Sequence, residues 1–315
     1  MKRVALGRSG LQVSNLCFGG NVFGWTVDET ASHRLLDGFV DAGFNFIDTA
    51  DVYSKWHEGN KGGESETIIG TWLKARGNRD KVIIATKVGS DMGGTEKGLS
   101  KAYILRAVDR SLKRLQTDYI DLYQSHWDDL SVPVEEALSA YADLIKAGKV
   151  RSIGASNFTA ERLNAALAAH KRDGLPRYES FQPEYNLCER AGFEAELAGI
   201  CAANGIGVIT YFSLAGGFLT GKYRSKDDLS KSARGSDVEK YLGERGQRIL
   251  AALDDVAARH KATPARVAIA WLLAQPVVTA PIASATSPTQ LAELVAAAQL
   301  SLDAPSVAQL NDASA

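Results

Sequence analysis

Short apolar runs alternate with segments of helical periodicity along the chain, and this alternation restricts the fold more than any other feature. The eight apolar runs read NLCFGG, FNFIDTA, KVIIATKVG, YIDLYQSH, VRSIGASN, SFQPEYN, GVITYFS and VTAPIAS. Helices are expected at residues 28–43, 64–76, 100–116, 133–147, 159–170, 190–204, 237–260, 264–275 and 288–298. Strands that are apolar throughout are typical of a parallel sheet buried on both faces. Start signals for these helices are Asp28, Ser100, Pro133, Pro264 and Pro288.

This order of elements predicts an α/β fold, a closed (β/α)8 barrel of the TIM type. An open doubly wound sheet is the alternative, and it is disfavoured because no GxGxxG motif follows the first strand. Residues 1–14 alternate around a Gly-Arg-Ser-Gly turn, which predicts an additional N-terminal β-hairpin on the barrel floor. Extra loops and helix are expected in the C-terminal half, with a mobile loop at 224–243. No linker or repeat divides the chain, so we expect one domain over residues 1–315.

The composition excludes several classes of protein. The net charge of −1 over 315 residues provides no electrostatic surface for nucleic acid, and no basic helix suggests a membrane surface. The first ten residues lack the apolar core of a signal peptide, and no apolar stretch approaches a membrane-spanning helix. Cys17, Cys188 and Cys201 are odd in number and far apart, which predicts reduced core thiols in a cytoplasmic protein.

Polar side chains recur where the predicted strands end, which is the edge that carries the chemistry in barrels of this type. Asp48 and Tyr53 follow the second strand, Lys87 ends the third, and His126 ends the fourth. Each has an ordinary explanation as a turn former, a packing residue, a solvated charge or a structural histidine. Together, an acid, a phenol, an ammonium group and an imidazole on three consecutive strand ends are hard to explain by packing.

These four residues predict a proton-transfer site. A free Tyr phenol, with a pKa of about 10, is a poor acid near neutrality. The Lys87 ammonium group would lower the pKa of Tyr53, and Asp48 would keep that ammonium group charged and in place. His126 would hydrogen-bond the same substrate oxygen. The sequence shows no activated Ser or Cys, no metal-ligand cluster and no close pair of carboxylates, so we expect a hydride cofactor and no metal.

The motifs FIDTADVYS, IATKVG, QSHWDD, IGASNF, FQPEYN and FSLAGGFLTGKY together resemble the aldo-keto reductase family over essentially the whole chain. Members of that family are (β/α)8 barrels that reduce aldehydes and ketones reversibly with a nicotinamide cofactor. The resemblance implies a catalytic tetrad of Asp48, Tyr53, Lys87 and His126, with Tyr53 as the proton donor. It also explains the missing glycine motif, because the family binds its dinucleotide extended across the barrel mouth.

The resemblance further implies a set of cofactor-binding residues. Ser156, Asn157 and Gln182 correspond to residues that hold the nicotinamide carboxamide, and Tyr211 to the aromatic residue that stacks on the ring. The others, from the nicotinamide ribose through the pyrophosphate to the adenosine, are Gly20, Asn21, Asp48, Ser213, Leu214, Gly216, Lys222, Ser284, Thr286, Gln290 and Glu293.

The adenosine end departs from the family pattern. Thr286 and Ser287 stand where many members have basic residues, and Leu294 follows Glu293 where many have Asn. No Arg or Lys is present where the 2′-phosphate of NADPH is usually bound. The 2′-phosphate could still be bound by Thr286 and Ser287, or by the more distant Lys222 or Arg234. NADPH is the expected cofactor because members of the family usually use it, and NADH is the alternative.

The substrate is less constrained. Trp25, Trp56 and Trp127 lie in loops beside the catalytic positions and predict an aromatic-walled pocket, although each could instead pack a loop. Sugars, small aldehydes and fused-ring ketones are all compatible with such a pocket. We expect a small-molecule carbonyl or alcohol substrate and no nucleic-acid or membrane partner.

Two other functions remain open. In the first, Lys87 forms a Schiff base as in barrel aldolases. The neighbouring Asp48 argues against it because it should keep the amine protonated. In the second, the chain is a regulatory protein that binds cofactor with little turnover. His126 argues against this function because the slow relatives of the family tend to lack it.

Overall fold

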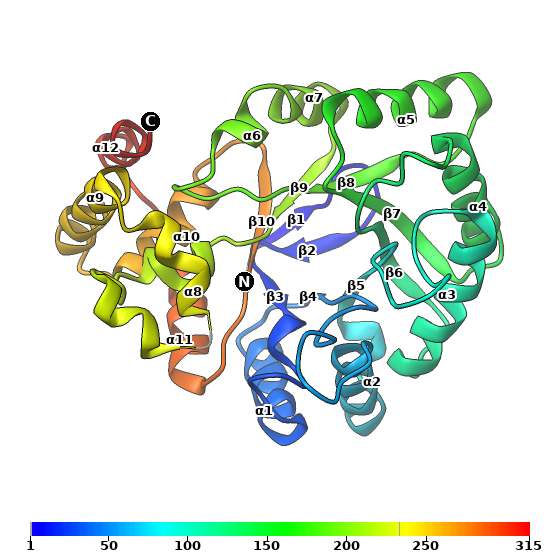
Figure 1. Cartoon of the computed structure of the whole chain (residues 1–315), viewed down its shortest axis with the longest axis horizontal. Coiled ribbons are helices and arrows are strands. Elements are labelled where there is room, and N and C mark those ends of the chain that lie inside the picture. The colour runs from blue at the N-terminus through cyan, green and yellow to red at the C-terminus, as the bar shows by residue number, and fades with distance from the viewer. Residues whose placement is uncertain (1, 233) are drawn as a thin grey trace.

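Eight parallel strands form a closed barrel in this computed structural model, which describes residues 2–232 and 234–315 (Figure 1). The strands are β3 Cys17–Gly19, β4 Phe46–Asp48, β5 Ile83–Val88, β6 Ile120–Ser125, β7 Val150–Ser156, β8 Tyr178–Gln182, β9 Gly207–Thr210 and β10 Val278–Ala283. Their circular order is β10-β3-β4-β5-β6-β7-β8-β9, so the last strand pairs with the first. The predicted (β/α)8 barrel is confirmed, and each strand overlaps its predicted run.

Helices surround the barrel (Figure 1). They are α1 Glu29–Asp41, α2 Glu64–Arg76, α3 Lys101–Leu115, α4 Val134–Lys146, α5 Ala160–Asp173, α6 Ala191–Glu194, α7 Leu197–Asn204, α8 Gly235–Val238, α9 Glu244–His260, α10 Pro264–Leu273, α11 Pro288–Ala297 and α12 Ala304–Ser314. Short 3-10 turns are η1 Gly20–Val22, η2 Arg79–Lys81, η3 Ala215–Thr220, η4 Lys226–Lys231 and η5 Glu239–Tyr241.

The start signals in the sequence position most of these helices. The side chains of Asp28 and Ser100 accept hydrogen bonds from backbone N–H groups in the first turns of α1 and α3. These bonds satisfy donors that a helix end otherwise leaves unpaired. Pro264 and Pro288 are the first residues of α10 and α11, where the missing N–H of proline costs nothing.

Three helical segments differ from the sequence-based predictions. The helix expected at 190–204 is divided into α6 and α7, because Glu196 leaves the helical conformation. The helix expected at 237–260 is interrupted before α9, because Gly243 has an extended conformation with a ψ of −179°. The region 224–243, expected to be a loop, contains η4, α8 and η5. Helix α12 was not predicted, and the buried Leu310 belongs to its packed face.

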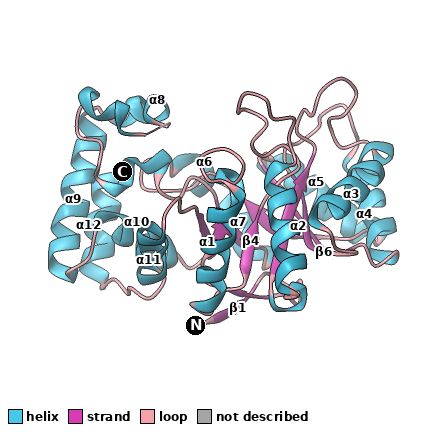
Figure 2. Cartoon of the chain, turned by 90° about the horizontal axis from the view of Figure 1, so that it is seen from below, coloured by secondary structure: helices cyan, strands magenta, loops and turns pink. Residues whose placement is uncertain are grey.

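The predicted hairpin consists of the antiparallel strands β1 Arg3–Ala5 and β2 Gln12–Ser14. Its residues Leu6, Leu11 and Val13 are buried against apolar side chains of the barrel interior, among them Phe46 and Leu122. Figure 2 shows β1 at the lower edge of the molecule, while the long loops project from the upper edge. The hairpin therefore closes the floor, and the mouth at the carboxyl ends of the strands is left for the functional site.

The largest apolar cluster lies between the strands and the surrounding helices and includes the fully buried Trp72 and Trp271. This layer accounts for the strands that are apolar on both faces. Cys17, Cys188 and Cys201 are buried and unbridged, as predicted. Within the described ranges, no helix combines the length and apolar character needed to cross a membrane.

Candidate active site

The four predicted catalytic residues meet at the barrel mouth. Asp48 is the last residue of β4, Lys87 lies near the end of β5, and His126 directly follows β6. The Lys87 Nζ atom lies 2.6 Å from Asp48 Oδ2 and 2.8 Å from the Tyr53 hydroxyl. The rings of Tyr53 and His126 are 5.9 Å apart between centroids. Parallel strands bring their carboxyl ends to one edge, and the turn after β4 returns Tyr53 to that edge.

Lys87 is held as an ammonium group by three acceptors. In addition to Asp48 and Tyr53, its Nζ donates a hydrogen bond of 2.9 Å to the backbone carbonyl of Thr49. An ammonium group has three N–H donors, and each has a partner here. The side chain is 0% exposed, so the paired carboxylate and the hydrogen bonds must together offset its lost hydration.

Two amide side chains hold Asp48 from the opposite side. Gln182 and Gln124 donate hydrogen bonds of 2.9 and 3.2 Å to Asp48 Oδ1. Gln182 was predicted as a carboxamide contact, and its own amide group is here directed at the catalytic carboxylate. Gln124 was not predicted, although an amide inside the buried strand run YIDLYQSH is a usable signal.

Burial raises the pKa of Tyr53 well above its ordinary value of 10.0, and the Asp48 carboxylate raises it further. This differs from the expectation that Lys87 lowers the pKa of the resting phenol. Burial disfavours the phenolate, and the Asp48 carboxylate disfavours it both by its charge and by accepting a hydrogen bond from the phenol. The phenol is therefore fully protonated near neutrality, and the Lys87 N–H at 2.8 Å can stabilise negative charge as it develops on the oxygen.

Burial, followed by the charge of Lys87, lowers the pKa of His126 well below its ordinary value of 6.5. The imidazole is therefore neutral near neutrality. Its Nδ1 lies 2.9 Å from the Ser90 hydroxyl. When Ser90 donates this bond, Nε2 carries the proton and is free to donate to a substrate oxygen. Ser90 was also missed, although its position three residues after Lys87, beyond the end of β5, was a signal.

The predicted carboxamide contacts and the predicted ring-stacking residue Tyr211 form one network beside the tetrad. The Tyr211 hydroxyl donates a hydrogen bond of 2.9 Å to Asn157 Oδ1, and Asn157 Nδ2 donates one of 2.9 Å to the His126 carbonyl. Ser156 donates to the backbone carbonyl of Gln182 at 2.8 Å. Asn157 has a positive φ of 56°, a conformation that non-glycine residues adopt rarely and often at functional sites.

The ends of β3 and β10 join at the same mouth. Ser284 donates a hydrogen bond of 2.6 Å to Asn21 Oδ1, which links the first and last barrel strands. A Cβ atom on Gly20 would lie 3.1 Å from the Asp48 carbonyl oxygen, so the backbone approaches the catalytic strand closely there. A larger residue at position 20 would collide with this strand and with Ser65, so glycine is needed there for packing.

The segment predicted to contact the pyrophosphate is a glycine-rich turn. Gly216 and Gly217 have φ values of 66° and 101°, which glycine adopts without strain. Ser213 is buried and lies 3.1 Å from the Thr210 hydroxyl, and Leu214 precedes the turn. Lys222 is exposed, its side chain lies close to Gly217, and its ammonium group is 4.9 Å from the centre of the Tyr223 ring.

The predicted adenosine contacts lie together but are already engaged. The Thr286 N–H and hydroxyl both donate to Gln290 Oε1, at 2.8 and 3.1 Å. Glu293 accepts a hydrogen bond of 2.6 Å from Thr263 and forms an ion pair with Arg266. Arg266 was missed because it belongs to α10, twenty or more residues before Thr286, Gln290 and Glu293.

Aromatic side chains surround the tetrad. Trp56 packs edge-to-face against both Trp25 and Tyr53, with ring centroids 5.7 and 5.9 Å apart. Trp127 lies parallel to His126, with a centroid separation of 6.1 Å. Trp56 and Trp127 are 49% and 51% exposed, respectively, so both offer apolar surface to a ligand. The guanidinium group of Arg234 lies 5.2 Å from the centre of the Trp25 ring.

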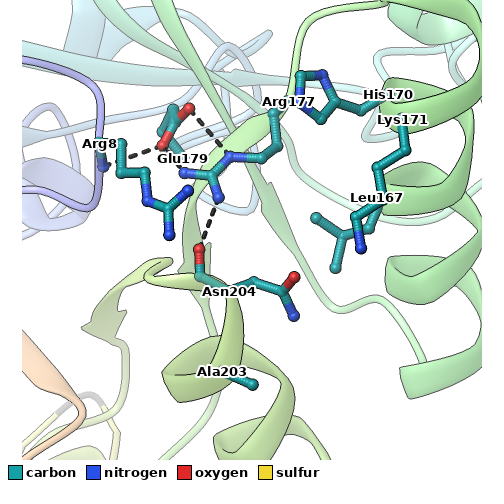
Figure 3. A pocket seen from close by; sticks show the side chains of 8 residues that line it. All are labelled: Arg8, Leu167, His170, Lys171, Arg177, Glu179, Ala203 and Asn204. Atoms are coloured by element: carbon teal, nitrogen blue, oxygen red, sulfur yellow. Dashed lines mark hydrogen bonds and ion pairs between the residues drawn. The ribbon is translucent and has the colours of Figure 1, made fainter.

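Two cavities have different relations to this site. One of about 650 Å³ is lined by Ser90 and Trp127 and extends away from the tetrad between the loops after β5 and β6. The other, about 290 Å³, lies near the hairpin and the start of β8 (Figure 3). There Arg177 pairs with Glu179 and donates to the carbonyl of Asn204, the last residue of α7. These contacts hold a helix end at the barrel floor, where polar residues usually serve stability.

Comparisons with known proteins agree with this geometry. Residues 15–315 match the family model described as "Aldo/keto reductase family". "Uncharacterized oxidoreductase YrpG" of Bacillus subtilis (strain 168) is 37% identical over 99% of this chain and 95% of its own length. "Aldo-keto reductase YhdN" of the same organism is 34% identical, over 93% and 88% of the two chains. A "Probable voltage-gated potassium channel subunit beta" of Oryza sativa subsp. japonica is 34% identical, over 91% and 88%.

Proposed function

We propose that this chain, which belongs to the aldo/keto reductase family, reduces an aldehyde or ketone to an alcohol, and catalyses the reverse oxidation, with Tyr53 as the proton donor. The observation that carries the proposal is the hydrogen-bonded arrangement of Asp48, Lys87 and Tyr53 beside a neutral His126. No single member of this set would suffice, because each has an ordinary structural explanation.

Each side chain has a separate role in the proposed reaction. His126 donates a hydrogen bond from Nε2 to the carbonyl oxygen and orients it. Tyr53 gives its hydroxyl proton to the same oxygen as negative charge develops there. Lys87 stabilises the resulting phenolate through its bond of 2.8 Å, and Asp48 keeps the ammonium group charged. Gln124 and Gln182 fix the Asp48 carboxylate.

We propose a nicotinamide cofactor, with NADPH as the first choice and NADH as the alternative. When bound, it supplies the hydride that the side chains of the site cannot supply. The residues present fit such a group: Gly216 and Gly217 form a turn of backbone without side chains just beyond β9, and Asn157 and Tyr211 offer amide and aromatic surface. The remaining predicted contacts are Asn21, Ser156, Gln182, Ser213, Leu214, Lys222, Ser284, Thr286, Gln290 and Glu293.

The aromatic side chains at the barrel mouth favour substrates that carry an apolar or flat group beside the carbonyl. Trp25, Trp56 and Trp127 are proposed as its walls, and the cavity beyond Trp127 leaves room for a larger substituent. The buried, unbridged cysteines support a reducing compartment such as the cytoplasm.

The two alternative functions receive less support. A Schiff base at Lys87 needs a free amine lone pair, whereas all three N–H groups of this ammonium have acceptors. A regulatory role draws support from the relatives named as channel β subunits. The complete tetrad, with His126 in place, favours turnover. A steady-state screen of aldehydes and ketones with NADPH and NADH separately distinguishes these functions.

Replacing Tyr53 with Phe tests the proposed function directly. Tyr53→Phe keeps the ring and removes the proton donor, so turnover should fall by about 10²- to 10⁴-fold. NADPH affinity, measured by fluorescence titration, should stay nearly unchanged. Tyr185→Phe is the matched control, since it removes another largely buried hydroxyl, bonded to Glu194 and outside the tetrad. A Tyr53→Phe enzyme that reduces the carbonyl at nearly the wild-type rate would refute the assignment and point to His126 as the donor.

A further inference from the structure

Asp51 is a buried acid in the turn that connects Asp48 to Tyr53. Its side chain is 3% exposed, and neither carboxyl oxygen has a hydrogen-bond partner within the described ranges. Its backbone N–H donates to the carbonyl of Lys87 at 3.3 Å, and the N–H of Tyr53 donates to the carbonyl of Ala50 at 3.3 Å. The turn is thus attached to the catalytic lysine residue and carries the proposed proton donor.

The titratable and charged groups that act on Asp51 come from every neighbouring element. They are Glu66 on α2, Tyr103 and Arg114 on α3, Lys87 on β5, Tyr123 on β6 and Tyr141 on α4. Both cations in this set are committed to other carboxylates. Arg114 Nε donates to Glu66 Oε2 at 2.6 Å, and Lys87 pairs with Asp48. An ionised Asp51 would therefore be an additional buried anion with no cation of its own.

The neutral acid is the form that this environment favours. A carboxylate buried without a partner is costly, and proteins usually avoid that cost by keeping the group protonated. Burial raises the pKa of Asp51 to about 8, and Glu66 raises it too. Arg114, the backbone N–H of Val52 and Lys87 act in the opposite direction and are outweighed.

We propose that Asp51 is a positioning residue for Tyr53: as a neutral acid it keeps the turn packed against the barrel wall, and its ionisation displaces Tyr53 from Lys87. This inference rests on the proposed function, in which Tyr53 donates the proton. It predicts that carbonyl reduction is lost at alkaline pH through a residue that does not touch the substrate.

The geometry of the turn explains why ionisation would be transmitted to Tyr53. An ionised Asp51 has no free cation beside it, because Arg114 and Lys87 are held by Glu66 and Asp48, so it is drawn toward Arg114 or toward solvent. Movement toward solvent is resisted just beyond Tyr53, where Ser54 is fully buried, has a φ of 72° and donates a hydrogen bond of 2.6 Å to the Phe23 carbonyl. The displacement therefore falls on the residues between Asp51 and Ser54, which include Tyr53.

The first test is the pH dependence of a single turnover of carbonyl reduction. Wild type should lose rate as pH rises through about 8, well before Tyr53 itself titrates. Asp51→Asn cannot ionise, so it should match wild type near pH 6.5 and retain its rate to a pH higher by about one unit or more. Asp109→Asn, an exposed carboxylate paired with Lys149 on the outer surface, is the matched control and should follow wild type. If Asp51→Asn keeps the wild-type alkaline limb, or is slow at pH 6.5, the inference is wrong.

The second test needs no substrate. The folded-state pKa of Asp51 is raised above its ordinary value of 3.8, so its contribution to stability is lost as pH rises from about 4 through about 8. The stability of Asp51→Asn relative to wild type, from urea unfolding, should therefore increase from pH 5 to pH 9. A constant difference would mean that Asp51 is ionised in the folded state, which overturns the inference. A protein that reduces no carbonyl but shows the increasing difference would refute the proposed function and leave a neutral Asp51.

Discussion

Lys87 carries a charge in the barrel interior because three oxygen atoms surround its ammonium group. The Asp48 carboxylate supplies the opposite charge, and Thr49 and Tyr53 accept the other two hydrogen bonds. A buried ion pair contributes little net stability compared with apolar packing, but removal of one partner is strongly destabilising. The pair is therefore better explained by the chemistry at Tyr53 than by the stability of the barrel.

Lys87→Met should lower the free energy of unfolding by about 3–5 kcal/mol, because it leaves the Asp48 carboxylate buried without a cation. The double variant Asp48→Asn, Lys87→Met removes both charges and should recover most of that loss. Both variants should lack turnover. Urea unfolding and NADPH oxidation with the best carbonyl substrate measure these effects. If the single variant is as stable as wild type, the ion pair does not hold the site together as described.

The two ends of the barrel have different roles. The hairpin closes one end and stabilises the fold, and the carboxyl ends of the strands form the proposed active site at the other. The side chains of Leu6, Leu11 and Val13 from the hairpin fill the floor, and the proposed catalytic residues stand at the opposite strand ends. Elements with strong local signals, such as α1 and α3 with their caps Asp28 and Ser100, were predicted nearly to the residue. Helix α12 was missed because its polar, alanine-rich sequence has a weak apolar pattern, and contact with α9 stabilises it instead.

Leu11→Ala should lower the free energy of unfolding by about 2–5 kcal/mol, since it opens a cavity at the floor. Turnover of the folded variant should stay close to wild type, because the floor is remote from Tyr53. Leu130→Ala, at a side chain that is 80% exposed, is the control and should change stability by no more than about 0.5 kcal/mol. A large loss of turnover in folded Leu11→Ala would contradict the separation of floor and mouth.

The packing of helices that are distant in the sequence determines which side chains surround the adenosine end of the proposed cofactor site. The sequence has no basic residue at positions 286 and 287, yet the fold brings Arg266 of α10 against Glu293 of α11. The Glu293 carboxylate neutralises this guanidinium, so its charge is only partly available to a 2′-phosphate. Discrimination between NADPH and NADH should therefore be modest in the wild-type protein.

Thr286→Arg should shift the preference toward NADPH by about 10- to 100-fold, because a charge-assisted bond to phosphate contributes about 1.5–3 kcal/mol. Thr286→Gln enlarges the side chain without adding charge and is the matched control. The ratio of kcat/KM for the two cofactors is the measurement. A wild-type protein that already prefers NADPH strongly, with no further effect of Thr286→Arg, would show that Lys222, Arg234 or Arg266 holds the phosphate.

The sequence alone determined the eight-stranded barrel, its hairpin and the residues that the fold gathers at its mouth, because apolar periodicity and strand-end position are local properties of a chain. Only the tertiary structure decided the electrostatic state of those residues. The pKa of Tyr53 is raised by burial and by Asp48, and Asp51 faces groups from α2, α3, α4, β5 and β6. Burial and the proximity of charges depend on residues far apart in the sequence, so no local sequence pattern determines these pKa values.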